Sequence, residues 1–282
     1  MSLKHTRTSA RRTGRRALRP TRRIPRPVRS AMLRAAANHP EPYVSVIIPA
    51  MNEAGTIAKV IAGARGVHPR CEVIVVVNGS ADHTADIALS LGAQVILFEQ
   101  PLGHDVGRSI GAEAAKGEVL LFTDGDLVIP ASQLRPFVAA VSQGTDVALN
   151  NYSGPVRGKF PHPVVLSKHA LNIILGRPDL KGCSMTAVPH ALSRKAFAGL
   201  GSSLLSRPPL AHAQAVLDGL VVKAVHKIPV GKLNAIRPKR AGADPLREVI
   251  LRDHLDAAGL VIERRGERAG FSDGNRRREM VR

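Results

Sequence analysis

The chain has 282 residues, 44% of them hydrophobic, which suits one large globular α/β domain or two small ones. Aromatic residues make up only 3% and tryptophan is absent, so aliphatic side chains have to build the core. Two cysteines are too few for a disulfide framework, and no apolar run reaches the roughly 18 residues of a transmembrane helix. We therefore expect a cytoplasmic protein, with peripheral attachment to the inner face of the membrane as an open alternative.

The formal net charge of +19 lies mainly at the two ends of the sequence. Residues 1–35 contain twelve Lys and Arg and no acidic residue, and residues 264–282 carry a net charge of +4, which leaves +3 for residues 36–263. We interpret residues 1–42 as a disordered Arg-rich leader and residues 266–282 as a basic tail. The leader would contact an anionic surface such as nucleic acid or lipid, act as a targeting segment, or reflect a misassigned start codon.

Regular secondary structure is predicted from residue 43, where a β-branched run ends in a proline and a loop and a helical pattern follow. The alternation repeats, and it predicts helices at 82–91 and 105–116 between strands at 43–49, 72–77, 93–98 and 118–123. Strands that alternate with helices form a mainly parallel sheet through right-handed crossovers. We therefore predict an α/β fold whose ligands bind beyond the carboxyl ends of the strands.

The second half of the sequence is less regular but shows no linker, so we treat residues 43–265 as one domain. Its patterns predict two further strands, at 146–151 and 221–226. They also predict four helices, at 164–175, 189–200, 209–219 and 245–263.

Two carboxylates directly follow the apolar strand at 118–123: Asp124 and Asp126, with Gly125 between them. Carboxylate oxygens are ligands that hard cations such as Mg²⁺ and Mn²⁺ prefer, and such a cation neutralises charge on a leaving diphosphate. Gly125 lets the backbone approach a ligand closely. Because aspartate and glycine are also common turn residues, an ordinary turn is the alternative.

Three more polar loops follow strands at the same predicted edge of the sheet, at residues 49–53, 78–84 and 100–108. Each supplies polar side chains or glycine where a nucleotide would lie. Asp82 and Thr84 would also serve as ordinary caps of the helix that follows them.

Taken in order, these motifs make residues 43–151 resemble the family 2 glycosyltransferases of the GT-A fold. The matching residues are Pro49, Asn52 and Glu53, then Asn78-Gly79-Ser80, the glycine-rich segment from Gly103 to Arg108, and the Asp-x-Asp motif at Asp124 and Asp126. The resemblance implies a nucleotide-sugar-binding half at 43–151, a UDP- or GDP-linked sugar as donor, and Mg²⁺ or Mn²⁺ as cofactor.

The resemblance also implies roles for single residues of this half. It assigns Asp126 to the metal and the diphosphate, Asp124 with Gly125 to the ribose or the metal, Arg108 to the donor region, Asn78 to the base, and Ala50, Asn52 and Glu53 to the nucleoside. Many relatives have an aspartate where this chain has Asn78, which leaves the identity of the base open.

Residues 152–265 would form the acceptor-side half. Residues 181–194 resemble the glycine-rich acceptor segment of these enzymes, which implies that Gly182, Ser184 and Met185 lie near the transferred sugar. His226, at a predicted strand end, is a candidate for the last metal ligand, with an ordinary strand-end histidine as the alternative. Asp179 is a candidate catalytic base if the enzyme inverts the sugar configuration.

The resemblance extends to glucosyl-phosphoglycerate synthases and polyprenyl-phosphate sugar transferases, so the acceptor would be a phosphoglycerate-like molecule, a polyprenyl phosphate or a cell-envelope glycan. A sugar-1-phosphate nucleotidyltransferase is a second hypothesis, although residues 49–55 lack the basic residues and repeated glycines of that class. A non-catalytic nucleic-acid-binding protein is a third, based on the leader.

Overall fold

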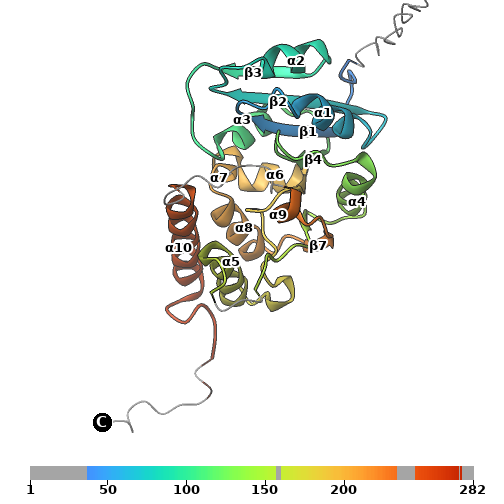
Figure 1. The fold of residues 1–282 in the computed structure, drawn as a ribbon. Coiled ribbons are helices and arrows are strands. Elements are labelled where there is room, and N and C mark those ends of the chain that lie inside the picture. The colour runs from blue at the N-terminus through green and yellow to red at the C-terminus, as the bar shows by residue number, and fades with distance from the viewer. Residues whose placement is uncertain (1–36, 157–159, 234–244, 273, 275–282) are drawn as a thin grey trace, which may run out of the picture. The chain divides into compact units, whose positions relative to one another are not determined.

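The computed structural model describes residues 37–156, 160–233, 245–272 and 274 (Figure 1). The predicted leader lies outside these ranges as far as residue 36, and the predicted basic tail lies outside them from residue 275. No helix in the described ranges is long and apolar enough to cross a membrane.

A seven-stranded sheet with the order β3-β2-β1-β4-β6-β5-β7 forms the centre of the described residues (Figure 1). Only the pairs that include β6 are antiparallel, which confirms the predicted mainly parallel sheet. The strands are β1 (Val44–Ala50), β2 (Cys71–Asn78), β3 (Gln94–Phe98), β4 (Val119–Phe122), β5 (Val147–Asn150), β6 (His190–Ser193) and β7 (Val222–His226).

Continuous Val, Ile and Leu runs explain why β1, β2 and β4 lie in the middle of the core. All eight residues of β2 and all four of β4 are buried, because helices cover both faces of a parallel sheet. β2 and β4 pair with β1 in parallel, so the carboxyl ends of the three strands lie at the same edge of the sheet. The loops after β1, β2 and β4 therefore emerge side by side at one edge.

The helices connect and flank the strands, and the predicted helices at 82–91, 105–116, 164–175, 209–219 and 245–263 are confirmed to within a few residues. The helices are α1 (Ile57–Arg65), α2 (Thr84–Ser90), α3 (Val106–Ala114), α4 (Ala131–Ser142), α5 (Pro163–Ile174), the 3-10 turn η1 (Pro178–Leu180), α6 (Arg194–Leu200), α7 (Ser202–Leu205), α8 (Pro208–Leu217), α9 (Val230–Leu233) and α10 (Pro245–Arg265). Helix α4 is not predicted from the sequence, and it contains Pro136, a residue that disfavours the helix interior.

The predicted single helix at 189–200 is wrong in its first third. Residues 190–193 form β6, which pairs with β4 on one side and β5 on the other, and α6 begins only at Arg194. Ala191 and Leu192 are good helix formers, but both are fully buried between two strands. Tertiary pairing therefore overrides the local helix propensity.

The folded unit extends beyond the predicted bounds of 43 and 265. The side chain of Asn38 exchanges two hydrogen bonds with the backbone of Val73 in β2, at 2.8 and 3.1 Å. At the other end, Ala269 is buried in a small second core. That core joins α5, α8 and α10, which pack against one another (Figure 1).

Candidate active site

The loop after β1 and the loop after β4 form one continuous backbone surface. The Gly125 amide donates to the Pro49 carbonyl at 3.0 Å, and the Thr56 hydroxyl donates to the Gly125 carbonyl at 2.8 Å. A Cβ atom at position 125 would lie 2.9 Å from the Cβ of Ala50. Glycine is therefore required by close packing between two of the predicted donor residues.

Asn52 joins the loop after β1 to the loop after β2. Its backbone amide donates to the Ser80 hydroxyl at 3.0 Å, and its side-chain oxygen accepts from the Ala81 backbone amide at 2.8 Å. Asn52 has a φ of 57°, a left-handed conformation that asparagine tolerates better than most residues. The Pro-x-x-Asn-Glu motif thus positions the loop by its own hydrogen bonds.

Asp82 and Thr84 complete this junction. The Glu53 amide donates to the Thr84 hydroxyl at 2.8 Å, and the Ala54 amide donates to Asp82 Oδ2 at 3.0 Å. The sequence analysis treated both side chains as caps of the next helix. Asp82 does accept from the Thr84 amide, but it also bonds to the neighbouring loop.

Asn78 fixes the glycine-rich loop that follows β3. Its side-chain oxygen accepts from the Leu102 amide at 2.7 Å, and its Nδ2 donates to the Gly103 carbonyl at 2.9 Å. The side chain uses both ends of its amide, and the residue is only 8% exposed. An aspartate could not make the second bond, so the asparagine matches the loop conformation of this chain.

Arg108 in the first turn of α3 links two carboxylates. Its guanidinium donates to Asp124 Oδ1 at 2.9 Å and forms a short ion pair with Asp105. The arginine is 5% exposed, and its Nε has no hydrogen-bond partner. The positive charge predicted for the donor region therefore lies directly beside the first aspartate of the Asp-x-Asp motif.

Burial and charge act in opposite directions in this cluster. Burial alone would lower the pKa of Arg108, but Asp124 and Asp105 outweigh it and raise that pKa. Burial raises the pKa of Asp105, and Arg108 and His104 offset this only in part. Arg108 is thus a permanent cation held between two acidic groups.

His190 lies close to the same cluster, at the start of β6. Its ring stacks on Phe122, the last residue of β4, with the ring centroids 4.9 Å apart. Burial first, and then the nearby Arg108 guanidinium, lower the pKa of His190 to about 3. His190 is therefore neutral at physiological pH and adds no second positive charge beside Arg108.

The two carboxylates after β4 are suitable ligands for a hard divalent cation. Asp124 and Asp126 are partly exposed at the edge where the loops meet, and carboxylate oxygens suit Mg²⁺ or Mn²⁺. Within the described ranges, no three His, Cys, Asp or Glu residues form a group that could hold a metal ion. Asp124 and Asp126 are therefore two carboxylates that fit a divalent cation, without a third such residue beside them among the described residues.

His226 does not complete a metal-binding group with these two aspartates. It ends β7, the edge strand of the sheet, where its Nε2 lies 3.4 Å from Gln133 Oε1 and its ring meets Phe137 edge to face. In this structure, His226 therefore does not have the position predicted for a metal ligand beside Asp124 and Asp126.

The predicted acceptor segment is tightly packed beside α5. A Cβ atom on Gly182 would lie 2.6 Å from the Ser153 carbonyl oxygen, so the chain passes there without room for a side chain. Ser184 and Met185 are each 1% exposed, and the Ser184 hydroxyl has no hydrogen-bond partner. The three residues are next to one another, but their side chains do not line an open surface.

Asn172, in α5, holds this segment through its side chain. Its Nδ2 donates to the carbonyls of Lys181 and Cys183 at 2.8 and 2.9 Å. Its Oδ1 lies 2.7 Å from His212 Nε2, which must therefore be the protonated nitrogen. Burial lowers the pKa of His212 to about 3, which keeps this cluster neutral.

Asp179 is held by Arg177. Both of its oxygens accept from the Arg177 guanidinium, at 2.9 and 2.8 Å, and Arg177 also donates to the Val222 carbonyl of the edge strand β7. The hydrogen bonds from Arg177 lower the pKa of Asp179, which makes it a weaker base. The structure thus gives Asp179 an ion-pairing role rather than the geometry of a catalytic base.

Asp105, Asn172 and His190 lie in these clusters but are not among the residues predicted from the sequence. Asp105 lies inside the glycine-rich segment from Gly103 to Arg108, so its charge is a usable signal. Asn172 and His190 carry no comparable signal, because their roles depend on partners that the sequence does not bring close.

The geometry of these loops agrees with what comparison with known proteins shows. The family model of glycosyl transferase family 2 matches residues 45–190, which is more than half of the chain. The chain belongs to glycosyltransferase family 2. The matched range runs from β1 to the first residue of β6 and contains all four loops of the site.

Individual relatives match a shorter part. The chain is 35% identical over 129 residues to glycosyltransferase AglE of Haloferax volcanii, a match that covers 43% of this chain and 41% of that protein. It is 30% identical over 128 residues to glucosyl-3-phosphoglycerate synthase of Mycobacterium tuberculosis, covering 40% and 39%. The chain thus spans about two fifths of the length of these curated relatives.

Solved structures show the same fold over more of the chain. A crystal structure of the M. tuberculosis glucosyl-3-phosphoglycerate synthase in complex with Mn²⁺, UDP and phosphoglyceric acid has a TM-score of 0.53 and 21% identity. The match covers 77% of this chain and 79% of that chain. This likeness supports the GT-A fold of family 2 glycosyltransferases.

Proposed function

We propose that this protein transfers a sugar from a nucleoside diphosphate sugar, with UDP-linked donors as the first candidates and GDP-linked donors as the second. The observation that carries the proposal is the meeting of four loops at one edge of the sheet, joined through Gly125, Asn52 and Asn78. Asp124 and the buried Arg108 form an ion pair at this edge, and Asp126 follows directly after Gly125. The neighbouring structures in complex with UDP and UDP-glucose support the choice of donor.

Asp124 and Asp126 would hold Mg²⁺ or Mn²⁺ together with the diphosphate. When bound, such an ion neutralises charge on the leaving nucleoside diphosphate as a Lewis acid. Arg108 donates to Asp124 at 2.9 Å and so orients that carboxylate. It also leaves a fixed positive charge near the place where negative charge develops during transfer.

The loops after β1 and β2 would bind the nucleoside. Ala50 and Gly125 pack closely against each other, and Asn52 and Glu53 hold the adjoining loop through their backbone amides. Asn78 would act on the base indirectly, because its amide is committed to the loop at 102–103.

The acceptor would be a phosphorylated molecule, either phosphoglycerate-like or a polyprenyl phosphate. Support comes from two relatives, glucosyl-3-phosphoglycerate synthase and the undecaprenyl-phosphate 4-deoxy-4-formamido-L-arabinose transferase of Pseudomonas savastanoi, which is 27% identical over 119 residues. A cell-envelope glycan is the remaining candidate. The reaction would take place in the cytoplasm. Asp179 would not act as the catalytic base, because it is paired with Arg177.

Calorimetry on the full chain with UDP- and GDP-sugars, with and without Mn²⁺, tests the proposal. We expect metal-dependent binding of one donor and a loss of at least about 100-fold in affinity for Asp126→Ala, because a carboxylate ligand is removed. Asp86→Ala is the matched control, since its carboxylate is 77% exposed on α2. No donor binding in either condition would refute the proposal.

A further inference from the structure

Three histidines are buried among the described residues: His190, His212 and His254. In each of them one ring nitrogen donates a hydrogen bond to an oxygen of the protein, with the two atoms 2.7 to 3.1 Å apart. The other ring nitrogen has no partner in the described part of the chain. It is fully enclosed in His212 and His254, but it is not enclosed in His190. Of the three, His190 alone therefore presents a free ring nitrogen to a molecule outside the protein.

The free nitrogen of His190 is a hydrogen-bond acceptor. Nδ1 lies 3.1 Å from the Ala187 carbonyl oxygen, so Nδ1 carries the proton and Nε2 carries a lone pair. Burial first, and then the Arg108 guanidinium, lower the pKa of His190 to about 3, so the ring does not gain a second proton near neutral pH. A lone pair attracts a hydroxyl group, whereas the oxygens of a diphosphate carry no proton to donate to it.

The direction of this lone pair is fixed before any ligand binds. The imidazole ring stacks on Phe122 with an interplanar angle of 21°, and Phe122 itself is fully buried. The bond to Ala187 then sets which edge of the ring faces inward. An acceptor that is held in one orientation loses little freedom when a ligand binds to it.

The topology of the sheet brings His190 to the edge where the loops of the donor site meet. β6 runs antiparallel to β4, and its first residue, His190, lies opposite Phe122, the last residue of β4. The strand that follows β1 and β4 in the sheet thus delivers its beginning, rather than its end, to this edge. Asp124 is two residues beyond Phe122 in the chain.

The order of the strands also gives an order to the parts of a bound donor. In the proposed function the nucleoside lies over the loops after β1 and β2, and the diphosphate lies at Asp124 and Asp126 after β4. Neighbouring strands are about 4.8 Å apart, so the group attached to the diphosphate falls one strand further along, at β6. In a nucleoside diphosphate sugar that group is the sugar, which carries hydroxyl groups.

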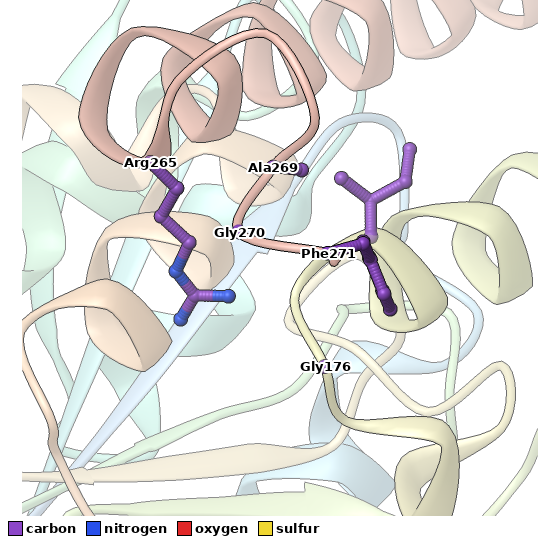
Figure 2. A pocket seen from close by; sticks show the side chains of 6 residues that line it. Gly176, Arg265, Ala269, Gly270 and Phe271 are labelled. Carbon is purple, nitrogen blue, oxygen red and sulfur yellow. The ribbon is translucent and has the colours of Figure 1, made fainter. Parts of the chain in front are cut away.

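The hollow of about 230 Å³ at the end of α5 has no comparable acceptor (Figure 2). Its walls are apolar side chains and glycines apart from Arg265, whose guanidinium donates to the Leu175 carbonyl at 2.9 Å. A guanidinium has no acceptor atom, and a sugar hydroxyl that is buried without a hydrogen bond is unfavourable. This hollow is therefore a poorer place for the sugar than the edge at His190.

We propose that His190 binds the transferred sugar, with Nε2 accepting a hydrogen bond from one of its hydroxyl groups. The inference rests on the proposed function and adds to the donor site a residue for the sugar itself. The hydrogen bond from Nδ1 to Ala187 would also join the bound sugar to the predicted acceptor segment, in which Ala187 lies.

Calorimetry on the full chain with Mn²⁺ and either UDP or UDP-glucose tests the proposal. For His190→Asn we expect the affinity for UDP-glucose to fall about tenfold and the affinity for UDP to change less than twofold. The reason is that the asparagine amide reaches the position of Nδ1 but not that of Nε2. His190→Gln places its side-chain oxygen near the position of Nε2 and should recover most of the lost affinity. GDP and GDP-mannose form the equivalent pair if the chain selects GDP.

His254→Asn is the matched control, because His254 is also buried and also directs Nδ1 at a backbone carbonyl, while its Nε2 is fully enclosed. It should change both affinities less than twofold. His190→Phe keeps a ring on Phe122 without a nitrogen, and it should show the same selective loss if His190→Asn does not fold.

Two results would overturn the proposal and leave the donor site intact. One is an unchanged affinity of His190→Asn and His190→Phe for UDP-glucose. The other is an equal loss of affinity for UDP and UDP-glucose in a folded variant, which would mean that His190 supports the loops rather than the sugar. If the unchanged protein binds no nucleotide of either pair, the proposed function itself fails, and this inference fails with it.

Discussion

Two buried polar clusters, one around Arg108 and one around Asn172, differ in charge. The cluster around Arg108 holds the donor edge with one cation between Asp105 and Asp124, and Asp124 is still 30% exposed. The cluster around Asn172 holds the acceptor segment with neutral groups only, and both Asn172 and His212 are fully buried.

This difference separates a cluster that is able to exchange partners from one that is not. Asp124 is 30% exposed, so an arriving cation would compete with Arg108 for Asp124, and a diphosphate would compete with Asp124 for Arg108. Asn172 bonds to two backbone carbonyls and a histidine, all inside the core. We therefore expect the first cluster to take part in binding and the second to hold the scaffold.

Arg108→Met gives the largest expected effect. The change would leave Asp105 and Asp124 near each other without their shared cation, and loss of one partner of a buried pair costs about 3 to 5 kcal/mol. We expect the free energy of unfolding in urea to fall by that amount and donor binding to be lost.

Arg264→Met is the control for this change, because Arg264 forms an ion pair with Asp218 in which the two side chains are 48% and 34% exposed. A pair of this kind contributes less than about 1 kcal/mol. Equal losses for the two variants would contradict the view that burial makes the Arg108 cluster special.

Asn172→Ala tests the neutral cluster. It removes three buried hydrogen bonds and leaves two carbonyls unpaired, so we expect unfolding to become easier by about 3 kcal/mol. Donor affinity measured by calorimetry should change less than twofold, because the cluster lies on the acceptor side. A large loss of donor affinity with little loss of stability would reverse the assignment of the two clusters. Gln214→Ala, which removes an exposed amide in α8, serves as the control.

The pH dependence of stability gives the smallest effect for each residue. The pKa of His190 and of His212 is about 3 in the folded protein, against about 6.5 when unfolded, so the unfolded chain binds more protons in acid. The contribution of the two neutral histidines to the free energy of unfolding is therefore fully present above pH 6.5 and is lost as the pH falls toward 3.

At pH 5 each histidine should cost about 2 kcal/mol relative to pH 7.5. Urea unfolding at the two pH values measures this loss, and His212→Gln should remove about half of it. If the free energy of unfolding does not change between these pH values, the pKa of the two histidines is not lowered in the folded protein, and the prediction is wrong.

The sequence predicted that the loops after β1, β2 and β4 meet at one edge of the sheet, because the signals for this arrangement are local. Each strand is a continuous apolar run, each loop follows it at once, and a parallel sheet brings these loops together without further information. Even the charge of Asp105 lay within a motif that had been identified. The sequence could not show that Asn78 binds a loop backbone, because that depends on the conformation of residues 102–103.

The acceptor half was harder to predict because its determinants are distant in sequence. Asn172 and His212 are forty residues apart, and neither is unusual in its local pattern. The residues of β6 favour a helix by propensity and become a strand only because β4 and β5 offer their edges. Asp179 was chosen for its position before the acceptor segment, and its pairing with Arg177 was not visible in the sequence.

The two hydrogen bonds between the Asn78 side chain and the loop at 102–103 also affect the chemical stability of the protein. An asparagine followed by glycine is the sequence most prone to spontaneous deamidation, in which the next backbone nitrogen attacks the side-chain amide. Here the Gly79 nitrogen donates to the Phe98 carbonyl at 2.9 Å, and both ends of the Asn78 amide are bonded. The folded state thus shields a chemically fragile dipeptide, and each excursion to the unfolded state exposes it. Conversion to aspartate would remove the bond to Gly103, so a single chemical lesion would loosen the loop that had protected it.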